Sequence, residues 1–315
     1  MDREDEGVWW DEEVQKKVGN SSPQHVTFVP PNPIALPMVD LPPMEPTDIE
    51  DVLPMIRMRD FTEEPLEVLS YGGGVQSTAM LILIRDGILP KPDIVIFSDT
   101  GSEMRETIDN VHEFGKTFSK DLGIPFAVVT SPRGRLHEDY HAKAAIPVIG
   151  NRSCTGNFKI APQRRFMRKI VGNKAGVVLV NSWLGITTDE EHRRTVSDVK
   201  WTHMRYPMLD EHRISRQQCL DLLKKNNMEV IKSGCFMCPY NHISYWKMIE
   251  REHPDLWEVA LKMEEQYRAN RPHRTMGLFY GKKWLKDLHF QASFEDYFEG
   301  AEDIPSCDSP AGCFI

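Results

Sequence analysis

Two kinds of hydrophobic pattern alternate along the chain from residue 66 onwards. Short apolar runs bounded by turn residues predict buried strands at 66–71, 93–97, 126–130 and 177–180. Between them, apolar residues at helical spacing predict helices over 77–85 and 103–122. Strands that alternate with helices of this length favour right-handed crossovers and a parallel sheet.

The pattern changes again in the second half of the chain, which is expected to be helical. Ser215 and Gln218 form a capping-box pattern that predicts the start of a helix. Pro254 suits the first turn of another helix, whose apolar positions recur at helical spacing up to Tyr267. The predicted fold class is therefore α/β, with a doubly wound, mostly parallel sheet and a helical C-terminal extension.

The first 65 residues follow neither pattern. Seven of the first thirteen residues are acidic, and nine prolines follow between positions 23 and 54. Prolines at this density remove backbone donors and block helices. This region is interpreted as an extended arm that lies over the core or over a partner, or as a disordered tail. The predicted division is an arm at 1–65, an α/β domain at 66–210 and a helical region at 211–315.

Charge and composition narrow the class of protein. The net charge of −9 over 315 residues argues against a protein that binds nucleic acid over its whole surface, but it allows a local basic patch. No apolar run approaches about 20 residues, so no membrane span is expected. The acidic N-terminus does not resemble a signal peptide, and a cytoplasmic location is expected. Six cysteines are too few for a disulfide scaffold and favour metal binding or catalysis.

The stretch LSYGGGVQSTAM, residues 69–80, places three glycines between a predicted strand and a predicted helix. Such glycines let backbone N–H groups approach an anion, and the helix N-terminus adds partial positive charge. Ser77 and Thr78 supply hydroxyl donors at the same place. The pattern is neither a P-loop nor a dinucleotide fingerprint. A tight turn without a ligand is the alternative interpretation.

The residues SYGGGVQS, 70–77, resemble the PP-loop of the adenine nucleotide alpha-hydrolase-like superfamily, whose usual form is S-x-S-G-G-x-D-S. Gly72 replaces the inner serine, and Gln76 replaces the aspartate, which puts the usual way of holding Mg²⁺ in question. The resemblance implies a Rossmann-like fold and a site for ATP, or for PAPS or APS as substrate. The nucleotide-binding residues that it implies in this loop are Ser70, Gly72, Gly73, Gly74, Gln76, Ser77 and Thr78.

A second resemblance follows the next predicted strand, in FSDTGSEMRET. Asp99-Thr100-Gly101, followed by Glu106-Thr107, is similar to the D-T-G-x-x-x-x-E-T of sulfonucleotide (PAPS/APS) reductases. An acid at the carboxyl end of a parallel strand is placed to meet adenosine. The resemblance implies that Asp99, Thr100 and Gly101 line the nucleotide site. The alternative is a turn followed by a helix cap at Ser102.

Three cysteines form the candidate metal site. Cys235 and Cys238 make a C-x-x-C, and Cys154 opens CTGNFKIAP, which resembles the C-C-x-x-x-K-V-x-P of iron–sulfur sulfonucleotide reductases. Thr155 replaces the second cysteine of that motif. The resemblance implies that Cys154, Cys235 and Cys238 hold a [4Fe–4S] cluster, with zinc or no metal as alternatives. Proposed fourth ligands are Cys307, Cys313 and His242, unless the fourth iron stays open.

Lys159 also matches the reductase motif and is a candidate catalytic residue, as are Cys307 and Cys313 in the tail. The reductases keep their nucleophilic cysteine in E-C-G-L-H, which is absent here, so both tail cysteines are also compatible with metal ligands or surface thiols. Cys219 lies on an apolar helical stripe and is expected to be buried. Basic residues near Cys154 are expected to bind phosphate or sulfate, or to be solvated; they are Arg133, Arg135, Arg152, Arg164, Arg165, Arg168, Lys169, Arg193 and Arg194.

The chain from residue 66 onwards resembles uncharacterised proteins of the PAPS reductase family, some of them from phages. Three functions follow from this resemblance. The first is adenylation by ATP, which releases AMP and pyrophosphate and precedes sulfur transfer to a nucleic-acid or small-molecule acceptor, with a protein as the sulfur donor. The second is sulfonucleotide reduction with release of sulfite. The third is a non-catalytic partner subunit that binds nucleotide and metal.

Overall fold

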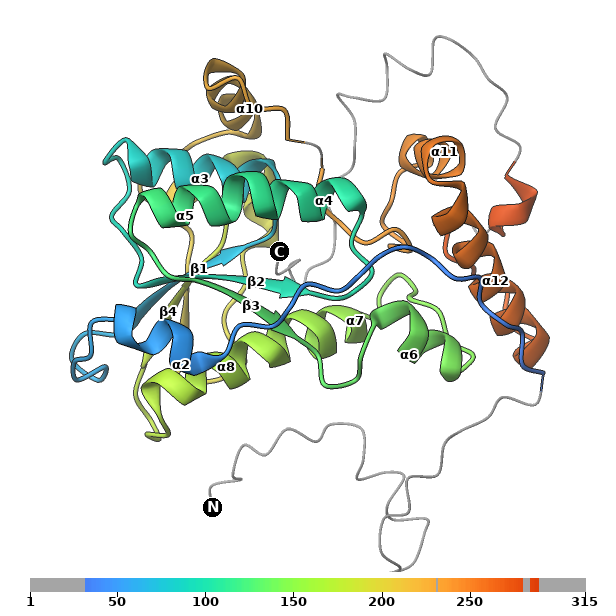
Figure 1. Ribbon diagram of the computed structural model, residues 1–315, viewed down its shortest axis with the longest axis horizontal. Helices are drawn as coiled ribbons and strands as arrows, with labels where there is room; N and C mark the ends of the chain where they lie inside the picture. The colour runs from blue at the N-terminus through green and yellow to red at the C-terminus, as the bar shows by residue number, and fades with distance from the viewer. Residues whose placement is uncertain (1–31, 231, 280–283, 289–315) are drawn as a thin grey trace, which may run out of the picture.

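A five-stranded, all-parallel sheet forms the centre of the computed structural model, which describes residues 32–230, 232–279 and 284–288 (Figure 1). The strands are β1 (Leu66–Tyr71), β2 (Ile94–Asp99), β3 (Phe126–Thr130), β4 (Val180–Trp183) and β5 (Thr202–Arg205). Their order in space is β3-β2-β1-β4-β5. The chain therefore winds from β1 to one edge and then returns to build the other edge, which confirms the doubly wound α/β fold.

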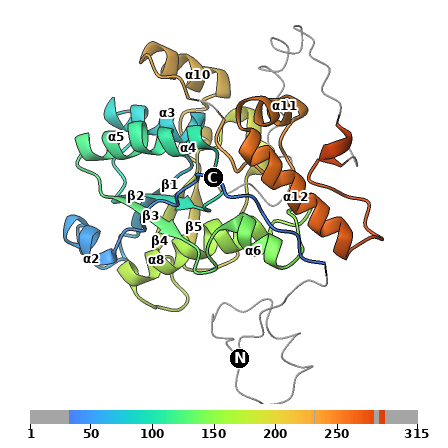
Figure 2. The ribbon, with the colours of Figure 1, turned by 45° about the vertical axis from the view of Figure 1, so that its right-hand side comes forward.

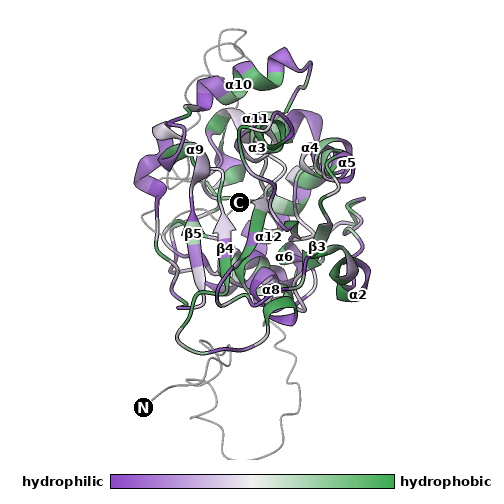
Figure 3. Ribbon diagram, turned by 90° about the vertical axis from the view of Figure 1, so that its left-hand side faces the viewer, coloured by the Kyte–Doolittle hydropathy of each residue, from purple (hydrophilic) through white to green (hydrophobic). Residues whose placement is uncertain are grey.

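Helices cover both faces of the sheet (Figures 1 and 3). One face carries α3 (Val75–Arg85), α4 (Arg105–Asn110), the π-helix η2 (Val111–Lys116), α5 (Thr117–Asp121) and α10 (Arg216–Lys225). The other face carries α8 (Ala161–Val171) and the short α2 (Ile49–Val52). Successive strand residues point to opposite faces, so Leu69 and Tyr71 pack against α3 while Val68 packs on the α8 side.

The C-terminal region builds a separate hydrophobic core beside the sheet. In this core, α11 (Ile243–Glu252) and α12 (Pro254–Asn270) pack with α6 (Leu136–Ala142) of the preceding domain (Figure 2). Trp246 of α11 is fully buried there. Both helix starts in this half were predicted and are confirmed. The Ser215 hydroxyl accepts from Gln218 N at 3.2 Å, the Gln218 side chain accepts from Ser215 N at 2.8 Å, and Pro254 opens α12.

Short elements connect the longer ones. They are η1 (Leu53–Met55), α7 (Ser153–Thr155), the π-helix η3 (Gly156–Ile160), η4 (Thr188–Arg193), α9 (Pro207–Asp210) and η5 (Leu285–Asp287). The α7–η3–α8 run is continuous and carries Cys154 and Lys159. A π-helix inside an α-helical run is unusual and often occurs at functional sites.

Two of the predicted elements differ from the observed ones. The strand predicted at 177–180 is instead Val180–Trp183, because pairing with β1 sets the register and matches Val180 to Leu66. Asn181 and Ser182 thus lie in the strand although they are polar. The helix predicted at 103–122 begins at Arg105 and includes a π-helical turn, and β5 was not predicted at all.

The described part of the N-terminal region lies against the domain. Thr47 N donates to Val128 O at 2.8 Å, which attaches this segment to the edge strand β3. Further along towards the N-terminus, Ile34 N donates to Gln266 of α12. Figures 1 and 2 show the segment passing between these two points. It therefore ties the C-terminal helices to the sheet. Among the described residues, no helix has the length and apolarity needed to cross a bilayer.

Candidate functional site

The glycine loop, Gly72–Gly74, connects β1 to α3 at the carboxyl end of the sheet. Gly73 adopts φ +70°, and a Cβ there would lie 3.1 Å from the Thr107 carbonyl oxygen. A Cβ on Gly74 would lie 2.5 Å from the Ser233 hydroxyl oxygen. Both positions therefore require glycine for backbone conformation or close packing, before any ligand is considered.

The Ser77 hydroxyl holds the glycine loop in shape. Its oxygen accepts from Gly72 N at 3.2 Å and from Gly74 N at 3.3 Å, and it donates to Gly74 O at 3.2 Å. The first N–H groups of α3 have no acceptor within their own helix, as at any helix start. Gly74 to Ser77 line a cavity, so this helix N-terminus offers partial positive charge to an anion placed there.

The central cavity has a volume of about 440 Å³ and joins two chemically different ends. One end is formed by the glycine loop and the start of α3. The other end is formed by three cysteines. The residues of this lining include Gly74, Gln76, Ser77, Thr100, Arg152, Cys154, Lys159, Glu190, Arg193, Arg216, Lys232, Cys235 and Cys238.

The three cysteines reach the cavity from two parts of the chain. Cys154 lies in α7, while Cys235 and Cys238 lie in the cysteine loop, residues 232–241, which precedes α11. Two backbone hydrogen bonds tie the cysteine loop to the β2–α4 connection: Met104 N donates to Gly234 O at 3.0 Å, and Phe236 N to Ser102 O at 3.1 Å. Tertiary pairing, rather than sequence proximity, brings these thiols to one cavity.

A hydrogen bond with Cys238, together with burial, raises the pKa of the Cys235 thiol well above its usual value. The environment of Cys235 therefore favours its protonated, thiol form. Among the residues that the structure describes, no three His, Cys, Asp or Glu side chains are grouped closely enough to hold a metal ion. The donor set is nevertheless chemically suited to a metal–thiolate group, because it offers three cysteine side chains at one cavity.

Lys159 reaches the same cavity as Cys154 although it lies five residues later. In a regular α-helix, residues five apart point in clearly different directions, but a π-helix closes its turn over about five residues. The π-helix η3 therefore allows both side chains to face the cavity. The Lys159 ammonium nitrogen lies 3.1 Å from Oε1 of Glu103. The lysine thus lies in the wall of a cavity that the glycine loop and the three cysteines also line.

Glu103 is a site residue that the sequence analysis did not identify. Its carboxylate is buried, and Oε1 also accepts from the Thr100 hydroxyl at 3.1 Å. Oε2 is buried and has no hydrogen-bond partner. The signal in the sequence was an acid two residues after the D-T-G turn. A connection this short keeps the side chain near the carboxyl edge of the sheet.

The pairing of Glu190 with Arg193 was also missed, since Arg193 was expected to bind phosphate or sulfate or to be solvated. Both side chains are buried and form an ion pair at 2.5 Å. Gln76 donates to the second Glu190 oxygen at 3.3 Å. The amide at the position where the PP-loop motif has aspartate thus contacts a carboxylate supplied from another element, η4.

Comparison with known proteins adds a family resemblance to this geometry. Residues 67–209 match the model of the phosphoadenosine phosphosulfate reductase domain. This segment is therefore similar to the PAPS reductase-like PP-loop superfamily. The matched residues contain the glycine loop, Glu103, Cys154 and Lys159, whereas Cys235 and Cys238 follow the matched domain.

Curated relatives of this PAPS reductase-like chain come from Methanocaldococcus jannaschii. One uncharacterized protein is 27% identical over 229 residues, which cover 69% of this chain and 45% of that protein. A second is 31% identical over 101 residues, covering 32% of this chain and 22% of that protein. The chain therefore spans less than half the length of the curated relatives that it matches.

A solved structure similar to this PAPS reductase-like chain is the U34-tRNA thiolase NcsA from Methanococcus maripaludis with its [4Fe-4S] cluster. The TM-score is 0.37 and the sequence identity 15%, over 76% of this chain and 80% of that chain.

The structure separates the other expected nucleotide-binding residues into two groups. Thr100 lines the cavity, but the hydroxyls of Ser70 and Thr78 bond within the protein, to Gln163 at 3.0 Å and to Tyr71 at 3.0 Å. Asp99 is buried, and its carboxylate accepts from Gly101 N and from Met44 N, each at 2.7 Å. Burial raises the pKa of Asp99, and these two hydrogen bonds oppose that change. Asp99 therefore anchors the turn and the N-terminal segment.

The remaining candidate residues lie elsewhere. His242 caps α11, where its ring nitrogen accepts from Ser244 N at 3.4 Å, and Cys219 is buried as expected. Cys307 and Cys313 lie outside the described residues. The basic residues do not form one patch: Arg152 and Arg193 line the cavity, whereas several others make contacts of their own. Those contacts are Arg164 with Asp198, Arg168 over Trp201, and Arg194 with Asp210.

Proposed function

We propose that this chain is an enzyme that activates an acceptor with ATP and then transfers sulfur to it. The observation that carries the proposal is the central cavity, which joins the N-terminus of α3 to three thiols within about 440 Å³. Cavities of this size suit small ligands and cofactors. An enzyme that only transfers phosphate needs no thiols at that end, and a simple thiol site needs no helix N-terminus.

The proposed binding mode follows from the charges around the cavity. The N–H groups at the start of α3 bind the phosphates of the nucleotide, and Lys159 neutralises the phosphate nearest the cysteines. Arg152, Arg216 and Lys232 also line the cavity and add positive charge, in a chain whose overall charge is −9. This arrangement stabilises the negative charge that develops when pyrophosphate leaves.

The proposed reaction has two steps. The acceptor oxygen attacks the α-phosphorus of ATP, the bond to the bridging oxygen breaks, and pyrophosphate leaves. A sulfide-level donor then attacks the acceptor carbon, and AMP leaves with the electron pair of the bond that breaks. Cys154, Cys235 and Cys238 would hold an iron–sulfur cluster, which would bind the incoming sulfur. Zinc on the same thiols is the alternative.

The test is product analysis with ATP, a candidate acceptor and sulfide under anaerobic conditions. The expected products are AMP and pyrophosphate in equal amounts. ADP as the product would contradict the proposal. Anaerobic reconstitution with iron and sulfide should give a broad brown absorption that disappears in Cys235→Ala and survives in Cys219→Ala, since Cys219 packs in the core of α10. Mg²⁺ omission tests whether the chain still needs a metal ion despite Gln76.

Sulfonucleotide reduction is the second candidate, favoured by the matched domain itself. In that reaction a thiolate attacks the sulfur of PAPS, the adenosine phosphate leaves, and reduction by a second thiol releases sulfite. Sulfite release from PAPS in the presence of a dithiol, without ATP, would establish this reaction. The nucleotide that the reaction consumes, ATP or PAPS, therefore separates the two functions.

A further inference from the structure

A buried carboxylate contacts the wall of the central cavity through Lys159. Only 2% of Glu103 is exposed, and it precedes α4, at the end of the turn that follows β2. Oε1 receives two donors, the Thr100 hydroxyl and the Lys159 ammonium, each at 3.1 Å. Oε2 receives none. A buried carboxylate oxygen without a donor is costly, so its position calls for an explanation beyond packing.

Backbone pairing shows which way the Glu103 side chain points. Glu103 and Cys235 form an antiparallel bridge, flanked by the hydrogen bonds Met104 N to Gly234 O and Phe236 N to Ser102 O. These two bonds leave Glu103 and Cys235 as a pair that does not exchange hydrogen bonds. In such pairs both side chains project to the same side and lie close together. The carboxylate therefore stands beside the cysteine loop.

Three segments of the chain meet at this carboxylate. Thr100 belongs to the turn after β2, Lys159 to the π-helix η3 beyond Cys154, and Cys235 to the cysteine loop. Lys159 has a long, flexible side chain that would otherwise sample many rotamers. An ion pair with a carboxylate that is itself 1% exposed restricts the ammonium to one part of the cavity wall.

We propose that Glu103 is a positioning residue that fixes the Lys159 ammonium where the phosphates of a nucleotide meet the cysteines. The inference rests on the proposed function for the identity of the nucleotide, but the placement of Lys159 is independent of it. Oε2 is a second acceptor on the same carboxylate. The ion pair with Lys159 therefore persists when a bound phosphate displaces the ammonium slightly. Glu103 itself does not line the cavity and touches no substrate.

The first experiment reads the position of Lys159 without any nucleotide. Purified full-length protein is treated with a limiting amount of an amine-acetylating reagent, and peptide mass spectrometry follows modification of Lys159. Glu103→Gln should increase the rate at Lys159 severalfold. Glu138→Gln is the matched control, because Glu138 is exposed and pairs with Arg135 at 3.6 Å. It should leave the rate at Lys159 unchanged.

The second experiment measures binding by calorimetry with ATP, inorganic triphosphate and adenosine as probes. Glu103→Gln should weaken ATP and triphosphate by about tenfold, as for coupled groups in one network, and should leave adenosine unchanged. Adding Lys159→Met to Glu103→Gln should produce little further loss. Glu103→Asp keeps the charge on a shorter side chain and should recover part of the affinity, which a purely structural role does not predict.

The outcomes separate this inference from the proposed function. A wild-type protein that binds neither ATP nor triphosphate would refute the proposed function, while the labelling rates would still decide the role of Glu103. Equal labelling of Lys159 in wild type, Glu103→Gln and Glu138→Gln would overturn the positioning role. Equal weakening of ATP and adenosine in a folded Glu103→Gln would also overturn it. If Glu103→Gln fails to fold, Glu103→Asp must show faster labelling at Lys159 than wild type.

Discussion

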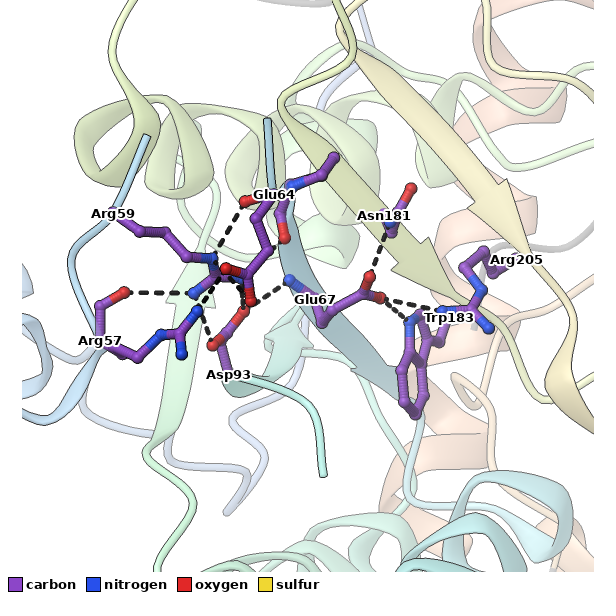
Figure 4. A network of polar contacts seen from close by, with 9 residues as sticks. Arg57, Arg59, Glu64, Glu67, Asp93, Asn181, Trp183 and Arg205 are labelled. Carbon is purple, nitrogen blue, oxygen red and sulfur yellow. Dashed lines mark hydrogen bonds and ion pairs between the residues drawn. The ribbon is translucent and has the colours of Figure 1, made fainter. Parts of the chain in front are cut away.

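Buried charged side chains are paired differently at the two ends of the sheet. Where β1 and β2 begin, a polar network pairs Arg59 with Asp93 at 2.6 and 2.9 Å and surrounds Glu67 with donors (Figure 4). The Glu67 carboxylate accepts from Asn181, Trp183 and Arg205. At the carboxyl end, by contrast, Glu103 keeps an unpartnered oxygen beside a cavity.

This contrast distinguishes a structural network from a functional one. In the amino-end network, the Arg59 guanidinium also donates to the backbone carbonyls of Arg57, Glu64 and Pro65, so its donors are used within the protein. Such saturation stabilises the fold and leaves nothing for a ligand. At the carboxyl end, unused acceptors and helix-terminal donors are retained, which is the arrangement expected where a ligand must complete the bonding.

The largest expected effect is at the carboxyl end. Lys159→Met should lower the free energy of unfolding by about 3–5 kcal/mol, because it leaves the buried acids Glu103 and Asp99 without this cation. Urea denaturation measures the change. The double variant Glu103→Gln/Lys159→Met should be more stable than Lys159→Met alone, since both partners of the ion pair are then neutral. A double variant that is less stable would contradict this account.

At the amino end, Arg59→Met should lower the free energy of unfolding by about 3 kcal/mol, because it leaves Asp93 partly buried and unpaired. The affinity for ATP should not change, since the network lies at the opposite end of the strands. Parallel urea denaturation and calorimetry test both statements. A loss of ATP affinity in a folded Arg59→Met variant would break the comparison between the two ends.

Glu264, a buried acid that lies at neither end of the sheet, should account for part of the pH dependence of the free energy of unfolding. Glu264 of α12 accepts from Leu278 N and Leu285 N, at 2.6 and 2.7 Å, and burial raises its pKa from 4.5 to about 7. The folded state binds the Glu264 proton more tightly than the unfolded state does. The resulting stabilisation of the folded state is complete below pH 4.5 and is lost as the pH rises to about 7. The loss is about 3 kcal/mol.

Denaturation at several pH values tests this contribution from Glu264. Wild-type stability should fall between pH 4.5 and 7, and Glu264→Gln should remove most of that slope. The charge variants at the two ends of the sheet should then be compared at pH 8, where Glu264 is ionised in all of them. An unchanged slope in Glu264→Gln would assign the pH dependence to other groups.

The smallest expected effect separates backbone strain from packing at the glycine loop. Gly73→Ala and Gly87→Ala both place a side chain at φ near +70°, which costs about 1 kcal/mol. Only Gly73 has atoms within 4 Å of the added Cβ, so Gly73→Ala should cost about 1 kcal/mol more. It should also weaken ATP binding, whereas Gly87→Ala should not. Equal losses of unfolding free energy in both variants would show that the glycine loop shifts to accommodate the added side chain.

Much of the α/β core could be predicted because its signals are local. The runs around Val68 and Ile96, the capping box at Ser215 and the proline at 254 each specify their element from a few neighbouring residues. Polar strands could not be predicted in this way. Asn181 and Ser182 become part of β4 because β1 lies beside them, and no property of those two residues indicates a strand.

The candidate site shows the same division. The sequence by itself determined the glycine loop, the turn after β2 and the chemical types of Cys154, Lys159 and the C-x-x-C, because these are carried by short motifs. Only the tertiary structure decided that the thiols share a cavity with the loop, and that Glu103 stands opposite Cys235. The physical reason is that pairing between distant segments depends on how the sheet, η3 and the cysteine loop pack together, and no short stretch of sequence encodes that packing.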